Sequence, residues 1–129
     1  MLDKLFDALE VGNSPFAIVG PSMGGGFALV YALSRPERVC ALVLVSPSVY
    51  RIGEEKKSKL ADLDIPVLLL WGERDKVFPL DEYGISLKEM LPRAKLLVAK
   101  HAGHGAHLEK PDEFNDLLRN FLSEVMLPP

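Results

Sequence analysis

The chain has 129 residues, of which 48% are hydrophobic and 26% charged, and its formal net charge is −3 at pH 7. This length and composition predict a single globular domain, residues 1–129, and the acidic balance without a basic patch argues against nucleic acid as a partner. The sequence contains neither a signal peptide nor the roughly 18 consecutive apolar residues of a membrane span, so we expect a cytoplasmic protein without membrane contact.

The first predicted element is an amphipathic helix over residues 1–11, which Gly12 ends. One face of this helix carries its large apolar side chains, which are Leu2, Leu5, Phe6 and Leu9. A short strand follows over residues 16–19, from Phe16 to Val19. Every position of this strand is apolar, which is typical of a strand that is covered on both faces.

The sequence GPSMG at residues 20–24 joins this strand to a predicted helix over residues 25–34. Ser22 then lies at a sharp, strained strand-to-helix turn that exposes its hydroxyl above the sheet edge. We expect Gly20 and Gly24 to be required because strand and helix approach too closely there for a Cβ atom. Glycine and serine are also common in ordinary turns, so the pentapeptide alone does not identify a functional site. The strand before it, the helix after it and two possible partner segments downstream support that interpretation.

A second strand is predicted at Val39–Val45 and a third at residues 67–71, with one connecting helix or loop of mixed charge between them. Asp75 lies in the loop just past the third strand, where open α/β sheets place functional groups. Aspartate is also common in plain turns. The rival carboxylate, Glu73, sits closer to the strand end and has less reach, so we favour Asp75 as the functional acid.

A fourth strand, Lys95–Ala99, leads into a loop that contains His101, His104 and His107, the three histidines of the chain. Zinc would require cysteines or carboxylates around them, and the one cysteine, Cys40, belongs to another strand, so we predict neither a metal nor a cofactor. One histidine acting as a general base fits better, because histidine titrates near neutrality. A last amphipathic helix, opened by proline, covers residues 111–126.

Three segments of the chain resemble the signature segments of the α/β-hydrolase superfamily and occur in that family's order of nucleophile, acid and base. They are GPSMGG at residues 20–25, WGERD at 71–75 and the stretch from Ala-Gly-His to KPDEF at 102–114. The resemblance covers nearly the whole chain. It implies an α/β fold in which a parallel sheet of about four strands has helices on both faces, as in the second half of an α/β-hydrolase fold.

Carried over by residue, the resemblance implies Ser22 as nucleophile, Asp75 as acid and His104 as base, with the Met23 backbone N–H as an oxyanion donor. His104 is preferred over the other two histidines because the family's base directly follows an Ala-Gly pair. Some members place the acid after the strand that follows the elbow, but residues 46–48 here read Ser-Pro-Ser. The implied activity is that of a serine esterase that cleaves a small acyl ester through an acyl-enzyme.

The resemblance covers only the C-terminal half of the family's core, and it matches the members without a lid insertion. The segment that would supply the second oxyanion N–H is not found in the sequence. We therefore keep a second hypothesis, a catalytically weak or silent half-domain that is a truncated product or a binding module. The strand at residues 16–19 carries no lysine or proline, so we expect its bare edge to pair with a second copy of the chain or with a partner chain.

Overall fold

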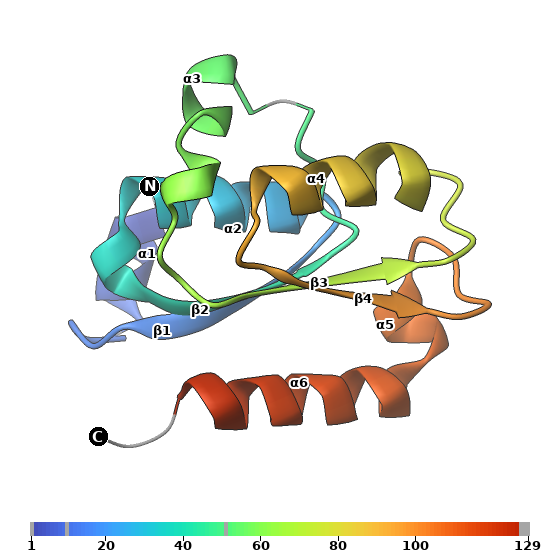
Figure 1. The fold of residues 1–129 in the computed structure, drawn as a ribbon. Coiled ribbons are helices and arrows are strands. Elements are labelled where there is room, and N and C mark those ends of the chain that lie inside the picture. The colour runs from blue at the N-terminus through green and yellow to red at the C-terminus, as the bar shows by residue number, and fades with distance from the viewer. Residues whose placement is uncertain (1, 10, 51, 127–129) are drawn as a thin grey trace.

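The computed structural model describes residues 2–9, 11–50 and 52–126, which form a sheet with helices packed against it (Figure 1). In chain order the longer elements are α1 (Leu2–Ala8), β1 (Phe16–Pro21), α2 (Met23–Ser34), β2 (Val39–Val45), α3 (Glu54–Lys57), β3 (Val67–Gly72), α4 (Ile85–Met90), β4 (Lys95–Ala99), α5 (Ala106–Glu109) and α6 (Pro111–Val125). Short helical turns lie at Pro36–Arg38, Leu60–Asp62 and Leu80–Gly84.

The sheet has four parallel strands in the order β1-β2-β3-β4, so the predicted fold class is confirmed. Its register places Val19 beside Val43 and Leu70 beside Leu97. Because all strands run the same way, their carboxyl ends meet at one edge, at the arrowheads of β3 and β4 in Figure 1. β1 and β4 are the two outer strands of this sheet.

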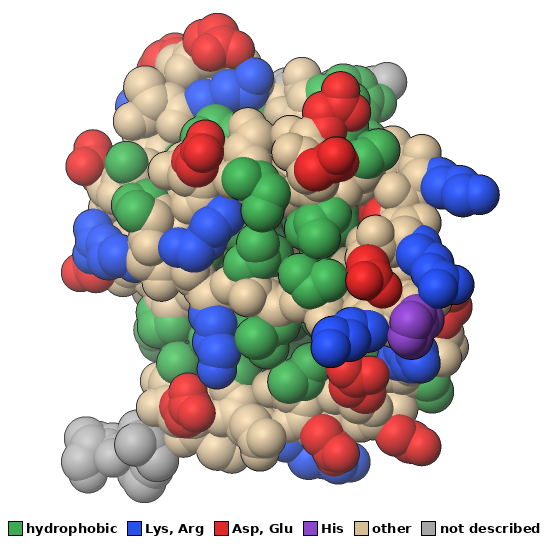
Figure 2. Space-filling model, turned by 45° about the vertical axis from the view of Figure 1, so that its right-hand side comes forward, with side chains coloured by type: hydrophobic (Ala, Val, Ile, Leu, Met, Phe, Trp, Pro, Cys, Tyr) green, Lys and Arg blue, Asp and Glu red, His purple; other side chains and the backbone are tan. Residues whose placement is uncertain are grey.

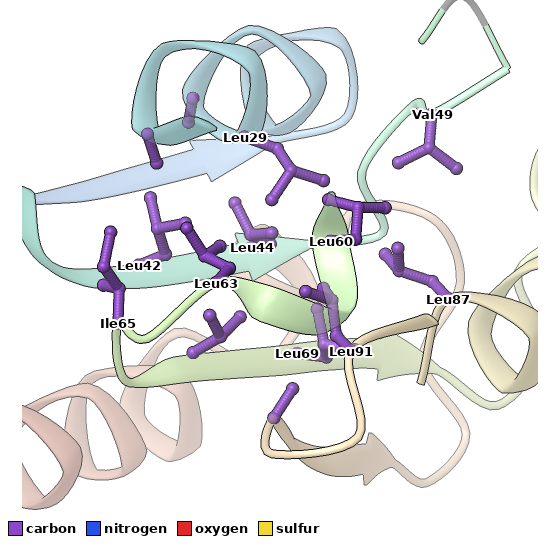
Figure 3. Close-up of a cluster of buried hydrophobic side chains, with 14 of the residues drawn as sticks. Leu29, Leu42, Leu44, Val49, Leu60, Leu63, Ile65, Leu69, Leu87 and Leu91 are labelled. Atoms are coloured by element: carbon purple, nitrogen blue, oxygen red, sulfur yellow. The ribbon is translucent and has the colours of Figure 1, made fainter. Parts of the chain in front are cut away.

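Helices cover both faces of the sheet, as predicted: α2, α3 and α4 lie on one side and α6 on the other (Figure 1). The side chains of the central strands alternate between the two faces. Leu42, Leu44 and Leu69 belong to the larger core beneath α2, where Figure 3 shows them pointing toward Leu29. Their neighbours on the opposite face pack against Phe121 of α6.

The last helix begins at Pro111, as the sequence predicts, and ends one residue earlier than expected. Its apolar stripe faces the sheet, with Phe121 buried and five further side chains partly buried. These five are Phe114, Leu117, Leu118, Leu122 and Val125. This stripe is therefore core packing and supplies the second covered face of the central strands.

The first helix is shorter than predicted, and two of the four apolar side chains predicted to share one face do not pack against the core. Leu2 and Phe6 pack against the core, and the Phe6 ring lies 4.8 Å from that of Phe16. Leu5 and Leu9 are instead 49% and 63% exposed. The reason is that α1 packs with one side only, against Phe16 at the start of β1 and Tyr31 of α2, so its other side faces solvent. Residues 1 and 10 of the predicted helix lie outside the described residues.

The segment between β2 and β3 contains less helix than the single connecting helix predicted for it. It holds only the four-residue helix α3 and the turn Leu60–Asp62. After α3 the chain turns inward because Leu60, Leu63 and Ile65 are buried in the larger core. Across the described ranges, no helix combines the length and the apolar character that crossing a membrane requires.

Apolar side chains also remain on the outside of the molecule. Figure 2 shows hydrophobic side chains gathered across the middle of the face seen there, with charged side chains around them. Val19 on β1, Met23 and Phe27 on α2, and Val98 on β4 are each at least 41% exposed. The prediction that both faces of β1 are covered is wrong at Val19, because β1 is an outer strand of the sheet.

Candidate active site

Ser22 forms a sharp turn between β1 and α2. Its backbone has φ 49° and ψ −119°, a region that residues other than glycine rarely adopt, so the strained turn expected from the sequence is present. The Ser22 N–H donates to the Val45 carbonyl at 2.9 Å, and the Ser48 N–H donates to the Ser22 carbonyl at 2.8 Å. The end of β2 therefore holds the turn in place. The helix α2 starts at Met23, two residues earlier than predicted.

The glycines around Ser22 follow the predicted steric logic only in part. A Cβ on Gly20 would lie 2.7 Å from the Gly25 Cα, so the requirement for glycine there is confirmed. A Cβ on Gly24 would meet nothing closer than 3.7 Å, so the prediction for that position is wrong. The close approach instead falls on Gly25, whose Cβ would lie 2.6 Å from the Pro47 Cβ, and on Gly26, whose Cβ would overlap the Ser48 carbonyl oxygen.

One chain of hydrogen bonds joins three side chains that are far apart in the sequence. Ser22 Oγ lies 2.9 Å from His104 Nε2, and His104 Nδ1 lies 2.8 Å from Asp75 Oδ2. With the proton on Nδ1, the imidazole donates to the carboxylate and accepts the serine hydroxyl. The structure thus brings together all three residues that the sequence analysis assigned to the site.

Asp75 is placed as an ionised acceptor beneath His104. Its side chain is fully buried, and Oδ1 accepts the N–H groups of Val77 and Phe78 at 2.9 Å each. Burial raises the pKa of Asp75, but hydrogen bonds from His104 and the Phe78 N–H outweigh that effect, and the pKa lies below its usual value. Asp75 can therefore hold one imidazole tautomer and stabilise a positive charge on the ring.

The other candidates from the sequence lie outside this chain of hydrogen bonds. The Glu73 carboxylate accepts the His101 N–H at 2.8 Å, a bond that lowers the pKa of Glu73. The His101 ring lies at the exposed rim, 2.9 Å from the Arg74 guanidinium. His107 lies in α5 with its ring 5.9 Å from that of Phe114. Glu73 and His101 thus stabilise the loop rim, and His107 packs against α6.

Backbone contacts lock the loop that carries Asp75 to the loop that carries His104. The Arg74 N–H donates to the Ala102 carbonyl at 2.8 Å, and the Glu73 N–H donates to the Ala99 carbonyl at 3.0 Å. A Cβ at Gly72 would overlap the Gly103 carbonyl oxygen, so the third strand must end in glycine.

Phe78 is a residue of the site that the sequence analysis missed. Its N–H donates to Asp75, its ring packs edge-on against the His104 ring at 5.4 Å, and its carbonyl accepts the indole N–H of buried Trp71 at 2.7 Å. The sequence offered only the position of Phe78, three residues after Asp75, and this spacing is too common to mark a residue as part of a site.

Met23, the residue predicted to supply an oxyanion donor, lies at the start of α2 directly after Ser22. Met23 is the first residue of α2, so its N–H has no partner within the helix. A helix start also favours developing negative charge. Across the described parts of the chain, no three histidine, cysteine or acidic side chains come together in a group that could hold a metal ion.

A cavity of about 360 Å³ opens beside Ser22. One wall comes from α2 through Met23, Phe27 and Val30, and the opposite wall comes from the segment after β2 through residues 48, 50 and 52. Val77 and Phe78 close it on the side of the Asp75 loop. All described residues that line this cavity are uncharged. Ser22 is therefore part of the lining of an apolar hollow.

This fold and site belong to a known class of proteins. The sequence model of the α/β-hydrolase fold family matches residues 2–56 and 49–111, so the chain belongs to that family. ABHD14B of Rattus norvegicus, whose name as a protein-lysine deacylase is provisional, is 29% identical over 124 residues, which are 96% of this chain and 56% of that protein. ABHD14A of Mus musculus is 27% identical over 127 residues, or 97% of this chain and 48% of that protein.

Solved structures share the fold over almost the whole chain. A hydrolase of Thermoplasma acidophilum described as CIB-like has a TM-score of 0.82 at 27% identity, over 95% of this chain and 57% of its own. MGS-MChE2, an α/β-hydrolase enzyme from a lagoon-sediment metagenome, has a TM-score of 0.82 at 26% identity, over 95% of this chain and 67% of its own. The chain spans about half the length of the curated relatives it matches.

Proposed function

We propose that this protein is a serine hydrolase, and within that class an esterase that cleaves a small acyl ester. The observation that carries the proposal is the unbroken hydrogen-bonded chain from Ser22 through His104 to Asp75. A buried ionised carboxylate, an oriented imidazole and a hydroxyl at a strained turn are the parts that acyl transfer needs.

In the acylation step, His104 Nε2 takes the hydroxyl proton as Ser22 Oγ attacks the acyl carbon. The carbonyl oxygen then becomes negative, and the Met23 N–H stabilises it. The bond to the leaving oxygen breaks, and His104 returns the proton to that oxygen. The products are an acyl-Ser22 ester and a free alcohol.

In the deacylation step, water takes the place of the alcohol. His104 removes a proton from water, the resulting hydroxide oxygen attacks the acyl carbon, and the proton passes to Ser22 Oγ as the ester bond breaks. Asp75 stays ionised in both steps and stabilises the imidazolium that forms twice in each cycle. The cycle needs no metal or cofactor.

Labelling with a fluorophosphonate probe tests the proposal directly, because this reagent reacts with activated serines. We expect the probe to label Ser22 and the Ser22→Ala variant to remain unlabelled. Ser46 and Ser48, the serines of the neighbouring loop, serve as matched controls when each is changed to alanine. Labelling that survives in Ser22→Ala, or that is lost only in a control variant, would contradict the proposal.

A second candidate function is a half-domain that becomes active only with a partner. Two observations favour it: β1 is an outer strand of the sheet, and the chain spans about half the length of its curated relatives. Since the Ser22 N–H points to β2, the alternating peptide groups of Ala17 and Val19 point to the open side. A second copy or a partner chain could pair there, and a partner could add a second oxyanion donor.

The turnover number separates the two candidates. Loss of one oxyanion donor lowers kcat on the order of 10²–10³-fold. Ordinary esterase turnover, on the order of 10 s⁻¹, by a monomer would therefore favour the complete enzyme. Turnover that appears only with a second chain would favour the half-domain. The in-frame sequence upstream of residue 1 offers an independent check.

Two further features of the sequence fit this proposal. The two segments matched by the family model meet at residues 49–56, in the linker where lidded members carry their insertion, which supports a core without a lid. Cys40 is a free thiol, which suits a reducing compartment such as the cytoplasm.

A further inference from the structure

We propose that the cavity beside Ser22 is an acyl pocket for an uncharged apolar acyl group of medium length, and that Phe27 limits the length of this group. This inference rests on the proposed function and specifies its substrate class. It depends on which side of Ser22 the cavity lies, what lines it, and what lies behind its far wall.

The position of the cavity assigns it to the acyl part of the substrate. His104 protonates the leaving oxygen, so the leaving group must lie on the His104 side of Ser22. The cavity is lined by Ser22 and Met23, the proposed nucleophile and oxyanion donor, whereas His104 is not among its described lining residues and packs its ring against Phe78, which is. An ester held by both Ser22 and Met23 therefore directs its acyl chain into the cavity.

The lining of the cavity defines the chemistry of the acyl group. Phe27, Tyr50 and Val77 expose 61%, 59% and 59% of their surface around the opening. The described lining is uncharged and largely apolar, so an apolar acyl chain gains by burial there, whereas a terminal carboxylate placed among these residues would lose its water shell. The pocket thus favours a neutral chain over a chain of equal length that ends in a carboxylate.

The volume of the cavity sets the size of the group. A cavity of about 150 Å³ holds a benzene molecule, and this one measures about 360 Å³. A second hollow of about 330 Å³ adjoins it between α1 and α2, and the lining of this hollow includes the Asp3–Arg35 ion pair beside apolar side chains. Phe27 and Val30 line both hollows, so these two side chains form the wall between them.

Of the two wall residues, Phe27 offers the cleaner variant. Val30 is half-buried, whereas Phe27 is largely exposed and its removal leaves the core intact. Phe27→Ala should join the two hollows and let longer acyl chains enter. Val98→Ala is the matched control, because Val98 is an exposed apolar residue on β4, outside both hollows.

The experiment measures kcat/KM for p-nitrophenyl acetate, butyrate, hexanoate, octanoate and decanoate, and for the hexanoate analogue that carries a terminal carboxylate. For the unaltered protein we expect a rise of about fourfold per added methylene up to the length that fills the pocket, then a fall. The carboxylate analogue should react on the order of 10²-fold more slowly than hexanoate. Phe27→Ala should move the optimum to a longer ester, and Val98→Ala should leave it in place.

The outcomes separate this proposal from the proposed function. If fluorophosphonate labels Ser22 and esters are hydrolysed, a flat chain-length profile or equal rates for the neutral and charged hexanoates would overturn the acyl pocket alone. Labelling of Ser22 without hydrolysis of any ester would overturn the esterase proposal together with the acyl pocket. An optimum that stays in place in Phe27→Ala would overturn the role of Phe27. A protein in which Ser22 is not labelled would overturn both proposals.

Discussion

The two sides of the candidate site differ in how completely the chain encloses them. Asp75 and His104, the proposed acid and base, come from loops after β3 and β4, which are joined by backbone hydrogen bonds and backed by α5 and α6. Asp75 has a side chain without solvent exposure. Ser22, the proposed nucleophile, directly follows β1, which has a strand on one side only, and Met23 and Phe27 beyond it are 64% and 61% exposed.

This difference separates two tasks of the site. The side that contains Asp75 and His104 must hold a negative charge in a fixed position, and the buried, hydrogen-bonded carboxylate of Asp75 does so. The nucleophile side must admit a substrate, and its apolar surface stays open beside the reacting atom. Substitutions beside Asp75 and His104 should therefore change kcat. Substitutions beside Ser22 should change substrate preference, the stability of the turn and self-association of the chain.

The largest effect is expected from the base. His104→Ala should lower kcat on the order of 10⁴–10⁶-fold, because Ser22 loses the group that accepts its proton. His101→Ala and His107→Ala are matched controls from positions three residues before and after His104, and both should stay within about tenfold of the unaltered protein. Ester hydrolysis measured on the three purified variants checks this. An essential His107 beside a dispensable His104 would show that the assignment within the loop is wrong.

The next largest effect is expected from the acid. Asp75→Asn should lower kcat on the order of 10⁴-fold, because an amide favours the wrong imidazole tautomer. Glu73→Gln, at the loop rim, is the control and should retain most of the activity. Kinetics at pH 7.5 test both variants, and comparable losses in both would contradict the distinction between the buried acid and the rim carboxylate.

The same residue should make folding stability depend on pH. The pKa of Asp75 in the folded protein lies below its usual value, so the ionised form favours folding. This contribution is fully present above the unfolded pKa of about 4 and is lost as the pH falls through the lower folded pKa. Urea unfolding between pH 7 and pH 3 should show a steeper loss for the unaltered protein than for Asp75→Asn. Parallel curves would contradict the lowered pKa.

A moderate effect is expected from the glycines on the nucleophile side. Gly26→Ala should cost about 1–3 kcal/mol of unfolding free energy, because its Cβ overlaps the Ser48 carbonyl and the turn must shift. Gly24→Ala should be neutral or slightly stabilising, since its Cβ meets no close neighbour and alanine favours helix. Chemical unfolding of the pair provides the measurement. Equal destabilisation would show that the turn is not limited by this contact.

The smallest effect on activity, and a test of the open side, is expected at the strand edge. We expect the chain to associate through β1, and Val19→Lys should weaken that association because lysine discourages strand pairing. Val98→Lys, on the outer strand β4, is the control for the opposite edge. Sedimentation over a concentration series distinguishes them. A monomer at high concentration with rapidly exchanging Ala17 and Val19 amides would contradict pairing at β1.

The sequence predicted those parts of the molecule that depend on short stretches of chain. The apolar runs Val39–Val45 and Lys95–Ala99 became strands with the predicted bounds, and Ser22, Asp75 and His104 could be proposed because each follows a strand in a local motif. Parallel topology then carries all three to the same edge of the sheet.

The features that the sequence could not predict depend on contacts between distant segments. The need for glycine at position 26 arises from Ser48, and the exposure of Leu5 and Leu9 arises because only the Leu2 and Phe6 side of α1 packs against the core. Phe78 contacts Asp75 through its N–H, His104 through its ring and Trp71 through its carbonyl, and no short sequence pattern predicts these three contacts.

The hydrogen bond from the Trp71 indole to the Phe78 carbonyl gives the protein an intrinsic optical reporter. Trp71 is the one tryptophan of the chain and is completely buried. Phe78, whose carbonyl accepts the hydrogen bond from Trp71, also lines the cavity and contacts His104. Any acyl group that displaces Phe78 should therefore change the emission of a single fluorophore. Occupancy of the site could then be followed in real time without a labelled substrate, even in variants that no longer turn over.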